Sequence, residues 1–444
     1  MRNPGGISGT MNERVQQIRN PPAKGGDMGK SLDRTIAMIL AGGEGKRLWP
    51  LTRDRAKPAV PFGGKYRIID FTLSNCLNSG IRRMAVLTQY KSFSLDRHIR
   101  TGWNIVNPEA GEFIVTVPPQ HRIGTDWYLG TADAIHQNMY LVEQEQAEHL
   151  LVLSGDHVYK MDYSQMFRFH NEVGADATVA AIRAPLAEAT RFGVIQVDEM
   201  GRIIGFEEKP KNPTPVPDDP THAYVSMGIY LFSTDQLSHY LADDAQTPGS
   251  AHDFGRNVLP AMRQEGRLYA FDFAQATNFG EKGDDNYWMD IGTIDAYWSA
   301  NMDLTSVSPK FNLYDKVWPL RTSPAQSPPA KFVFAQNADE GGRRGAALDS
   351  IVCGGSIISG GRVLGSVLSR GVRVGSYSEV SESILYDDVK VGRYARLHRV
   401  IVDKRVEIPE KIEIGYDQER DKQRFLVTDG GVTVVTQDMI ERLT

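Results

Sequence analysis

The sequence predicts an α/β domain with a mostly parallel mixed sheet, followed by a left-handed parallel β-helix. Short apolar strands alternate with helical stretches from residue 34 to about residue 305. A segment with five prolines and no sustained periodicity follows, and beyond it the sequence repeats at 17-residue intervals. We therefore expect a flexible leader over 1–33, the α/β domain over 34–305, a linker over 306–344 and the β-helix over 345–444.

Composition and charge indicate a soluble globular protein. Of the 444 residues, 41% are hydrophobic, and 50 Lys and Arg residues face 55 Asp and Glu residues for a formal charge of -5. This balance argues against a nucleic-acid binder and against a basic membrane-surface protein. Residues 1–30 hold no apolar signal-peptide core. We expect a cytoplasmic protein that binds neither nucleic acid nor membrane.

Four apolar segments predict strands of the parallel sheet, because unbroken hydrophobicity is typical of strands buried on both faces. They are 35–41, 84–88, 150–154 and 177–182. Residues 132–148 and 163–172 have the pattern of helices. Residues 193–197 and 202–207 flank a turn over 198–201, which predicts an antiparallel hairpin.

The repeat in the second domain predicts its architecture. Val372, Val374 and Gly375 recur 17 residues later as Val389, Val391 and Gly392, and again as Val406, Ile408 and Pro409. Three short strands make one triangular coil of a parallel β-helix, and 17 residues is such a coil with one corner shortened. The alternative is a β-sandwich, which would not explain several positions recurring together.

The motif A-G-G-E-G-K-R-L at 41–48 directly follows the first strand. Gly42, Gly43 and Gly45 would let backbone N–H groups approach an anion, and Lys46 and Arg47 add positive charge. The motif therefore predicts a phosphate site. It is neither a P-loop nor a dinucleotide fingerprint, and the alternative is a tight turn without a ligand.

Cations are concentrated between residues 45 and 67, where seven of them face the single carboxylate of Asp54. The segment also contains Gly63, Gly64, Pro58 and Pro61, which indicates a structured loop. It has no interleaved stacking aromatics, so small phosphorylated ligands fit better than nucleic acid. The seven cations are Lys46, Arg47, Arg53, Arg55, Lys57, Lys65 and Arg67.

Two carboxylates are candidate ligands for Mg²⁺. Asp156 ends the strand over 150–154, and Asp290 lies between apolar neighbours. Ligands of open α/β sheets bind beyond the carboxyl ends of the strands, and Mg²⁺ takes one or two carboxylates together with substrate phosphates. Either residue could instead cap a helix. Lys209, after a hairpin strand, suits a monophosphate, although it could be a surface lysine.

Together these residues resemble the sugar-nucleotide pyrophosphorylases, and among them the bacterial glucose-1-phosphate adenylyltransferases. The broad resemblance rests on the glycine loop. The narrower one rests on R-A-K-P-A-V-P-F-G-G-K-Y-R-I-I-D-F at 55–71, L-S-N-C-L-N-S-G-I at 73–81, W-Y-L-G-T-A-D-A-I at 127–135 and S-G-D-H-V-Y-K-M-D-Y at 154–163. E-K-P at 208–210 and H-D-F-G at 252–255 support it as well.

The resemblance implies a nucleotidyltransferase that forms ADP-glucose and pyrophosphate from ATP and glucose 1-phosphate with Mg²⁺. It implies catalytic roles for Arg47, Lys57 and Asp156, and metal binding by Asp156 and Asp290. Nucleotide binding would involve Gly42, Gly43, Gly45, Gln89 and Gly130. Glucose 1-phosphate would contact Tyr128, Gly193, Glu208, Lys209 and Ser226.

The resemblance also implies a homotetramer regulated by sugar phosphates or organic acids, with Arg55 and Lys57 as candidate effector residues. This chain has Lys46, Met289 and Asp54 where relatives carry other residues. Asp54 adds negative charge, so we expect weaker affinity for doubly phosphorylated effectors than for fructose 6-phosphate or pyruvate. The alternatives are a pyrophosphorylase for another sugar nucleotide, a non-catalytic regulatory subunit and, least supported, an acyltransferase.

Overall fold

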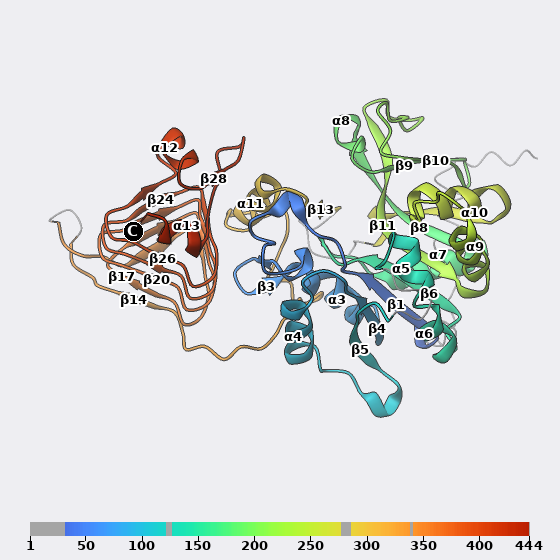
Figure 1. Cartoon of the computed structure of the whole chain (residues 1–444), viewed down its shortest axis with the longest axis horizontal. Coiled ribbons are helices and arrows are strands. Elements are labelled where there is room, and N and C mark those ends of the chain that lie inside the picture. The colour runs from blue at the N-terminus through green and yellow to red at the C-terminus, as the bar shows by residue number, and fades with distance from the viewer. Residues whose placement is uncertain (1–31, 121–126, 277–285, 338–340, 444) are drawn as a thin grey trace, which may run out of the picture.

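The computed structural model describes residues 32–120, 127–276, 286–337 and 341–443, and it contains two domains (Figure 1). An α/β domain occupies one side, and a stack of short strands occupies the other. The leader predicted over 1–33 lies outside the described residues except for its last two positions. Among the residues described, no helix is both long enough and apolar enough to cross a membrane.

A nine-stranded sheet forms the centre of the α/β domain, with the order β10-β9-β11-β6-β1-β4-β5 and with β8 and β12 joined through β11. Strand β1 (Thr35–Leu40) pairs in parallel with β4 (Arg83–Leu87) and β6 (His149–Ser154). The mostly parallel mixed sheet is therefore confirmed. The other strands are β5 (Phe113–Val117), β8 (Ala177–Pro185), β9 (Gly193–Val197), β10 (Ile203–Glu208), β11 (His222–Ser233) and β12 (Leu268–Asp272).

Both faces of this sheet are covered, as the unbroken hydrophobicity of the strands predicts. Ala37 and Ile39 of β1 belong to one apolar cluster, and Ile36 and Met38 belong to another. The larger helices are α3 (Ile68–Asn78), α4 (Phe93–Gly102), α7 (Tyr163–Val173), α9 (Thr234–Gln246), α10 (Leu259–Glu265) and α11 (Ile294–Asp303). The predicted hairpin is confirmed, since β9 and β10 pair antiparallel.

The single helix predicted over 132–148 is wrong. The segment forms two short helices, α5 (Thr131–His136) and α6 (Met139–Gln144). Between them, Asn138 leaves the helical conformation, and its side-chain amide donates hydrogen bonds to the Ala134 carbonyl at 2.8 Å and to the Tyr128 hydroxyl at 2.9 Å. This side-chain bonding competes with the regular helical pattern.

The second domain is a parallel β-helix, with its short strands stacked in three sheets. Ala346 pairs with Arg362, 16 residues later, and Arg362 pairs with Glu379, 17 residues later. The later coils keep the interval of 17, as the sequence repeat predicts. The sheets have the orders β14-β17-β20-β23-β26, β15-β18-β21-β24-β27 and β16-β19-β22-β25-β29-β28.

The strands of the β-helix are two or three residues long. They are β14 (Lys331–Val333), β15 (Ala346–Leu348), β16 (Ile351–Val352), β17 (Ile357–Ser359), β18 (Arg362–Leu364), β19 (Val367–Leu368), β20 (Arg373–Val374), β21 (Glu379–Ser381), β22 (Ile384–Leu385), β23 (Lys390–Val391), β24 (Arg396–His398), β25 (Val400–Val402), β26 (Glu407–Ile408), β27 (Glu413–Ile414), β28 (Leu426–Val427) and β29 (Thr433–Val435). Strand β29 pairs in parallel with β25, and β28 pairs antiparallel with β29. Strand β14 pairs with β17, so part of the segment 306–344 already belongs to a β-helix sheet.

Residues 311–321 lie against the α/β domain and are anchored to it by buried polar contacts. The Lys160 ammonium lies 2.9 Å from the Asp315 carboxylate, and both side chains are almost fully buried. The Trp318 indole N–H donates to the Asn75 amide oxygen at 2.8 Å. Buried polar groups with such partners fix one arrangement of the segment.

Candidate active site

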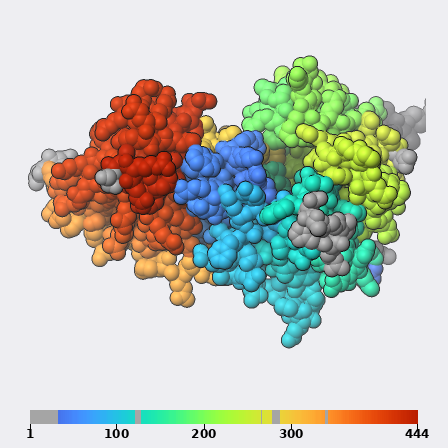
Figure 2. Space-filling model, viewed as in Figure 1, coloured from blue at the N-terminus to red at the C-terminus, as the bar shows by residue number. Residues whose placement is uncertain are grey.

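A cavity of about 760 Å³ opens beside the carboxyl ends of β1 and β6. The surface is recessed between the blue segment around residues 40–65 and the green lobe around residues 180–220 (Figure 2). Eleven of the residues predicted from the sequence line this cavity. They are Gly42, Gly43, Gly45, Arg47, Lys57, Gln89, Tyr128, Gly130, Asp156, Glu208 and Lys209.

The glycine loop after β1 forms one wall. Gly45 has a left-handed backbone with φ of 64°, which favours glycine, and it precedes the short helix η1 (Lys46–Leu48). A Cβ atom at Gly42 would lie 3.0 Å from the Gln89 Cβ atom, so the glycine keeps the loop close to Gln89. Arg47 is exposed and borders the cavity, whereas the Lys46 ammonium pairs with Glu44 at 2.5 Å.

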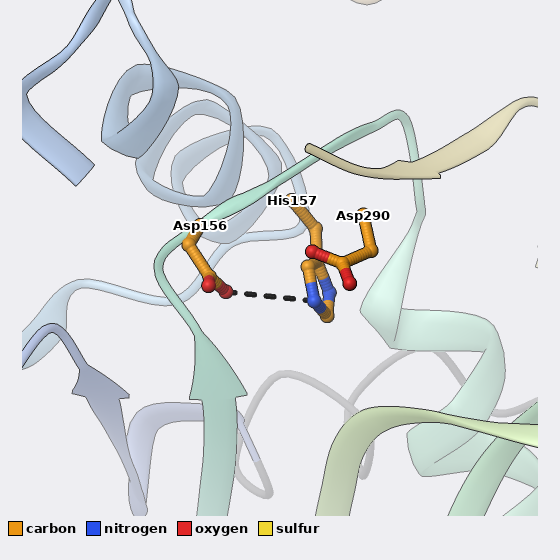
Figure 3. Close-up of side chains that lie close together, drawn as sticks. All are labelled: Asp156, His157 and Asp290. Carbon is orange, nitrogen blue, oxygen red and sulfur yellow. Dashed lines mark ion pairs between the residues drawn. The ribbon is translucent and has the colours of Figure 1, made fainter. Parts of the chain in front are cut away.

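Three charged groups from separate segments meet beside the cavity; Lys57 and Asp156 line it, and Asp290 lies outside its lining. The Lys57 ammonium lies 2.7 Å from an Asp156 carboxylate oxygen and 3.0 Å from an Asp290 carboxylate oxygen. Asp156 follows β6. Asp290 ends β13 (Trp288–Asp290), which pairs antiparallel with β7 (His157–Tyr159) so that Asp290 faces His157 across the ladder (Figure 3). The topology thus joins positions that are far apart in the sequence.

The charges of this cluster support one another. Burial on its own would raise the pKa of the Asp156 carboxyl, but Lys57, His157 and a hydrogen bond from Ser154 outweigh it and hold the pKa well below its ordinary value. Burial would likewise lower the pKa of Lys57, but Asp156 and Asp290 outweigh it and raise the pKa. The Asp156 carboxylate and the Lys57 ammonium are therefore charged at neutral pH.

The donor set at this point fits a divalent cation. One ligand atom each from Asp156, His157 and Asp290 lies within 4.8 Å of the others. Hard carboxylate oxygens are the protein ligands that Mg²⁺ prefers. The Lys57 ammonium touches both carboxylates, so the space between them already accommodates positive charge.

The far wall of the cavity carries Glu208 and Lys209, whose side chains form an ion pair. A Cβ atom at Gly193 would lie 3.0 Å from a Glu208 carboxylate oxygen, and one at Gly255 would lie 2.8 Å from the same oxygen. Gly193 does not line the cavity, but it leaves the space that the Glu208 carboxylate occupies.

Gly130 and Tyr128 form part of the remaining wall. A Cβ atom at Gly130 would lie only 2.2 Å from the His252 carbonyl oxygen, so this close approach of two backbones requires glycine. The Tyr128 hydroxyl accepts a hydrogen bond from Asn138. The break between α5 and α6 therefore also orients a residue of the cavity wall.

Two further predicted residues lie away from the cavity lining. Ser226 is buried in β11, where its hydroxyl donates to the Tyr230 hydroxyl at 3.3 Å. Arg55 is buried between the domains and makes two hydrogen bonds to the carboxylate of Asp403. Neither residue belongs to the cavity lining.

Sequence reasoning did not assign four further lining residues, Thr131, Ser154, Asp253 and Arg256. The Asp253 carboxylate accepts hydrogen bonds from the Thr131 hydroxyl and from the Gly255 backbone N–H, both at 3.0 Å. Arg256 is exposed at the cavity. The H-D-F-G motif at 252–255 marks this segment in the sequence, but the motif alone does not show that it meets Gly130.

The fold and the site together define a nucleotidyltransferase. A family model described as "Nucleotidyl transferase" matches residues 36–307, and one described as "GlmU-like, C-terminal hexapeptide" matches residues 328–435. The first covers the α/β domain with its cavity, and the second covers the β-helix.

Similar proteins narrow this class. The glucose-1-phosphate adenylyltransferase of Koribacter versatilis is 55% identical over 406 residues, which cover 91% of this chain and 95% of that protein. The enzyme of the same name from Rhodopirellula baltica is 53% identical over 94% of this chain and 93% of that protein. That from Yersinia pseudotuberculosis is 48% identical over 93% and 95%. The chain belongs to the glucose-1-phosphate adenylyltransferase family.

Proposed function

We propose that this chain transfers the adenylyl group of ATP to glucose 1-phosphate, giving ADP-glucose and pyrophosphate for glycogen synthesis. The observation that carries the proposal is the convergence of the glycine loop, Lys57 and Asp156 on one cavity, with Asp290 bound to Lys57 behind its lining, in a chain that matches adenylyltransferases over nearly its whole length. Retention of this charged cluster argues against a non-catalytic subunit.

The reaction requires the sugar-phosphate oxygen to attack the α-phosphorus of ATP in line with departing pyrophosphate. The backbone N–H groups around Gly42, Gly43 and Gly45, together with Arg47, would hold the departing phosphates. Gln89 and Gly130 would contact the base. Most of the rate enhancement would come from holding the two substrates in position and from neutralising the charge of the phosphates.

The sugar phosphate would bind at the opposite wall. Lys209 would neutralise its phosphate, and the Glu208 carboxylate would accept hydrogen bonds from sugar hydroxyls. Tyr128 would border the same site, while Gly193 and Ser226 would support it from outside the cavity lining. The two substrates would therefore approach each other across Lys57 and Asp156.

We propose Mg²⁺ as the cofactor, held by Asp156 and Asp290. When bound, the ion would polarise the phosphoryl oxygens and offset the charge that develops on them. Asp156 and Asp290 would orient the bound ion. Lys57 would hold the two carboxylates at a fixed separation and would contribute its own positive charge beside the ATP phosphates.

Regulation and assembly belong to the same proposal. We place an effector site for sugar phosphates or organic acids near Arg55 and Lys57, at the junction with the β-helix. Both cations are already bound to carboxylates, so an anionic effector there would compete with Asp403 or with the catalytic cluster. We further propose a homotetramer, located in the cytoplasm where ATP and glucose 1-phosphate are available.

One assay tests the activity: release of pyrophosphate with glucose 1-phosphate and each nucleoside triphosphate, with and without Mg²⁺. We expect turnover with ATP and loss of turnover with a chelator. The variant Asp156→Asn should lose about two orders of magnitude in kcat, whereas Asp243→Asn, an exposed change on α9, should behave as the parent. Preference for another nucleotide would support the rival pyrophosphorylases.

A further inference from the structure

A residue of the β-helix domain, Asp403, binds Arg55 of the α/β domain, which precedes Lys57 by two positions. Arg55 donates from Nη1 to one Asp403 carboxylate oxygen at 2.8 Å and from Nη2 to the other at 3.2 Å. Both residues are 8% exposed. A paired contact of this kind fixes the direction of the guanidinium as well as its distance, and its burial keeps water from replacing either partner.

The chain between Arg55 and Lys57 is short and constrained. Ala56 is buried and precedes η2 (Lys57–Ala59), a single turn closed by hydrogen bonds from the Ala59 N–H to the Ala56 carbonyl and from the Val60 N–H to the Lys57 carbonyl. Pro58 fixes one backbone angle of that turn. A displacement of Arg55 would therefore be passed to Lys57.

A second contact joins the β-helix to the segment after Asp290. The Tyr386 hydroxyl donates to the Tyr297 hydroxyl at 2.8 Å, and Tyr297 donates to the Pro61 carbonyl at 2.5 Å. Tyr297 belongs to α11, which begins four residues after Asp290. The Arg55 guanidinium lies 5.9 Å from the centre of the Tyr386 ring. The Arg55–Asp403 and Tyr386–Tyr297 contacts therefore lie next to each other at the junction of the two domains.

We propose that Asp403 is a positioning residue for the reaction. Through Arg55 it sets where the Lys57 ammonium stands between Asp156 and Asp290, and Tyr386 holds the segment on the other side. This inference rests on the proposed function, which assigns the two carboxylates to the metal. It gives the β-helix domain a part in the chemistry although none of its residues lines the cavity among those described.

The test uses Mn²⁺ binding to the full chain without nucleotide, measured by electron paramagnetic resonance. Lys57→Ala removes a cation from between the carboxylates, so it should tighten Mn²⁺ binding several-fold. Asp403→Asn should shift the Mn²⁺ affinity in the same direction. Added to Lys57→Ala, it should change the Mn²⁺ affinity of that variant by less than about twofold. In turnover, Asp403→Asn should lower kcat about tenfold while both Michaelis constants stay within about threefold.

The chain provides a matched control. Arg53 also forms an ion pair with an aspartate of the β-helix domain, Asp438, but this pair is much less buried than Arg55 and Asp403. Asp438→Asn should therefore bind Mn²⁺ and turn over as the parent does. If Asp403→Asn behaved like Asp438→Asn, or if its effect added fully to that of Lys57→Ala, Asp403 would not act through Lys57.

Two further outcomes separate the possible failures. Unchanged Mn²⁺ binding in Lys57→Ala would overturn the metal site and with it this inference, whereas the pyrophosphate assay tests the proposed activity separately. Should Asp403→Asn fail to fold, as judged by its thermal transition, Tyr386→Phe removes only one hydroxyl and keeps the apolar ring. Tyr386→Phe should tighten Mn²⁺ binding and lower kcat, as Asp403→Asn is expected to do. Parental values of both the Mn²⁺ affinity and kcat would overturn the inference.

Discussion

Lys209 lines the cavity from a left-handed backbone position, with φ of 51°, where we place the sugar phosphate. Its ammonium is half exposed and paired only with the neighbouring Glu208 among the described ion pairs. A flexible ammonium can neutralise a monophosphate without entering the bond that reacts. Its loss should therefore weaken substrate binding more than it slows the chemical step.

We expect Lys209→Ala to raise the Michaelis constant for glucose 1-phosphate about tenfold or more. The constant for ATP should change less than about threefold, because we place the triphosphate at the other wall of the cavity. Steady-state kinetics with each substrate varied in turn gives both values. Lys211→Ala, two residues along in the exposed loop, is the control, and equal effects on both substrates would contradict the assignment of Lys209.

His170 makes the stability of the α/β domain depend on pH. The ring is buried in α7, with Nδ1 2.8 Å from the Thr178 hydroxyl and Nε2 3.2 Å from the Ser233 hydroxyl. Burial, followed by the charge of nearby His149, lowers the pKa of His170 from 6.5 to about 3. Between these values the unfolded chain binds a proton that the folded chain does not, so stability falls as the pH decreases.

Moving from about pH 7.5 to about pH 5 should therefore cost about 2 kcal/mol of stability through His170 alone. Thermal melting at the two pH values should show a smaller decrease in Tm for His170→Gln than for the parent, since glutamine does not titrate. The pKa of His149 is also lowered by burial, and this residue is present in both proteins. An equal decrease in both proteins would show that His170 is protonated in the folded state.

At the scale of elements, a buried ion pair between Lys160 and Asp315 is one of the contacts that attach the segment 311–321 to the α/β domain. Asp315→Ala removes the carboxylate that pairs with Lys160 and leaves that charge in the core. We expect unfolding to require about 3 kcal/mol less free energy, measured by urea denaturation. Asp218→Ala breaks an exposed pair with Arg183 and should change the stability by less than about 1 kcal/mol; a similar loss in both variants would contradict the importance of burial.

The strands and the β-helix coils could be predicted because their signals are local. Residues 150–153 are apolar without interruption, and the positions of Val374, Val391 and Ile408 repeat because each coil buries the same strand position. The broken helix could not be predicted in this way. Its break at Asn138 depends on a bond to Tyr128, which belongs to another segment and is not visible in a helical pattern.

The site residues that could be predicted are those that lie in recognisable sequence motifs. Gly42, Arg47, Asp156 and Lys209 stand in such motifs, and all four border the cavity. Arg256 was not predicted, because its segment reaches the cavity only through a tertiary contact. The Ala132 N–H donates to the His252 carbonyl at 2.8 Å across more than a hundred residues, and no spacing in the sequence reports that approach.

At the scale of the whole molecule, the junction of the domains is where regulation is expected. The Asp54 side chain is 65% exposed and lies 3.0 Å from the Arg53 guanidinium, which in turn contacts Asp438 of the β-helix domain. Asp54 therefore adds negative charge beside the cations proposed to bind an anionic effector. This charge should disfavour a doubly phosphorylated ligand most.

Asp54→Lys should allow fructose 1,6-bisphosphate to activate the enzyme at about tenfold lower concentration. Titration of that effector at subsaturating ATP measures the change, with fructose 6-phosphate as the second ligand. Asp218→Lys makes the same change of charge on an exposed residue paired with Arg183 and should leave the titration unaltered. No gain in activation with Asp54→Lys would show that this position does not face the effector.

The pairing at the far end of the β-helix has a consequence for how the protein behaves at high concentration. A stack of parallel strands exposes unpaired backbone groups at its last strand, and such an edge can recruit strands from other chains and start aggregation. Here β29 covers β25, and the two-residue strand β28 then runs in the opposite direction along β29. A strand continuing the parallel pattern finds no matching partner on β28, so this one of the three sheets ends without a parallel template for growth into fibres.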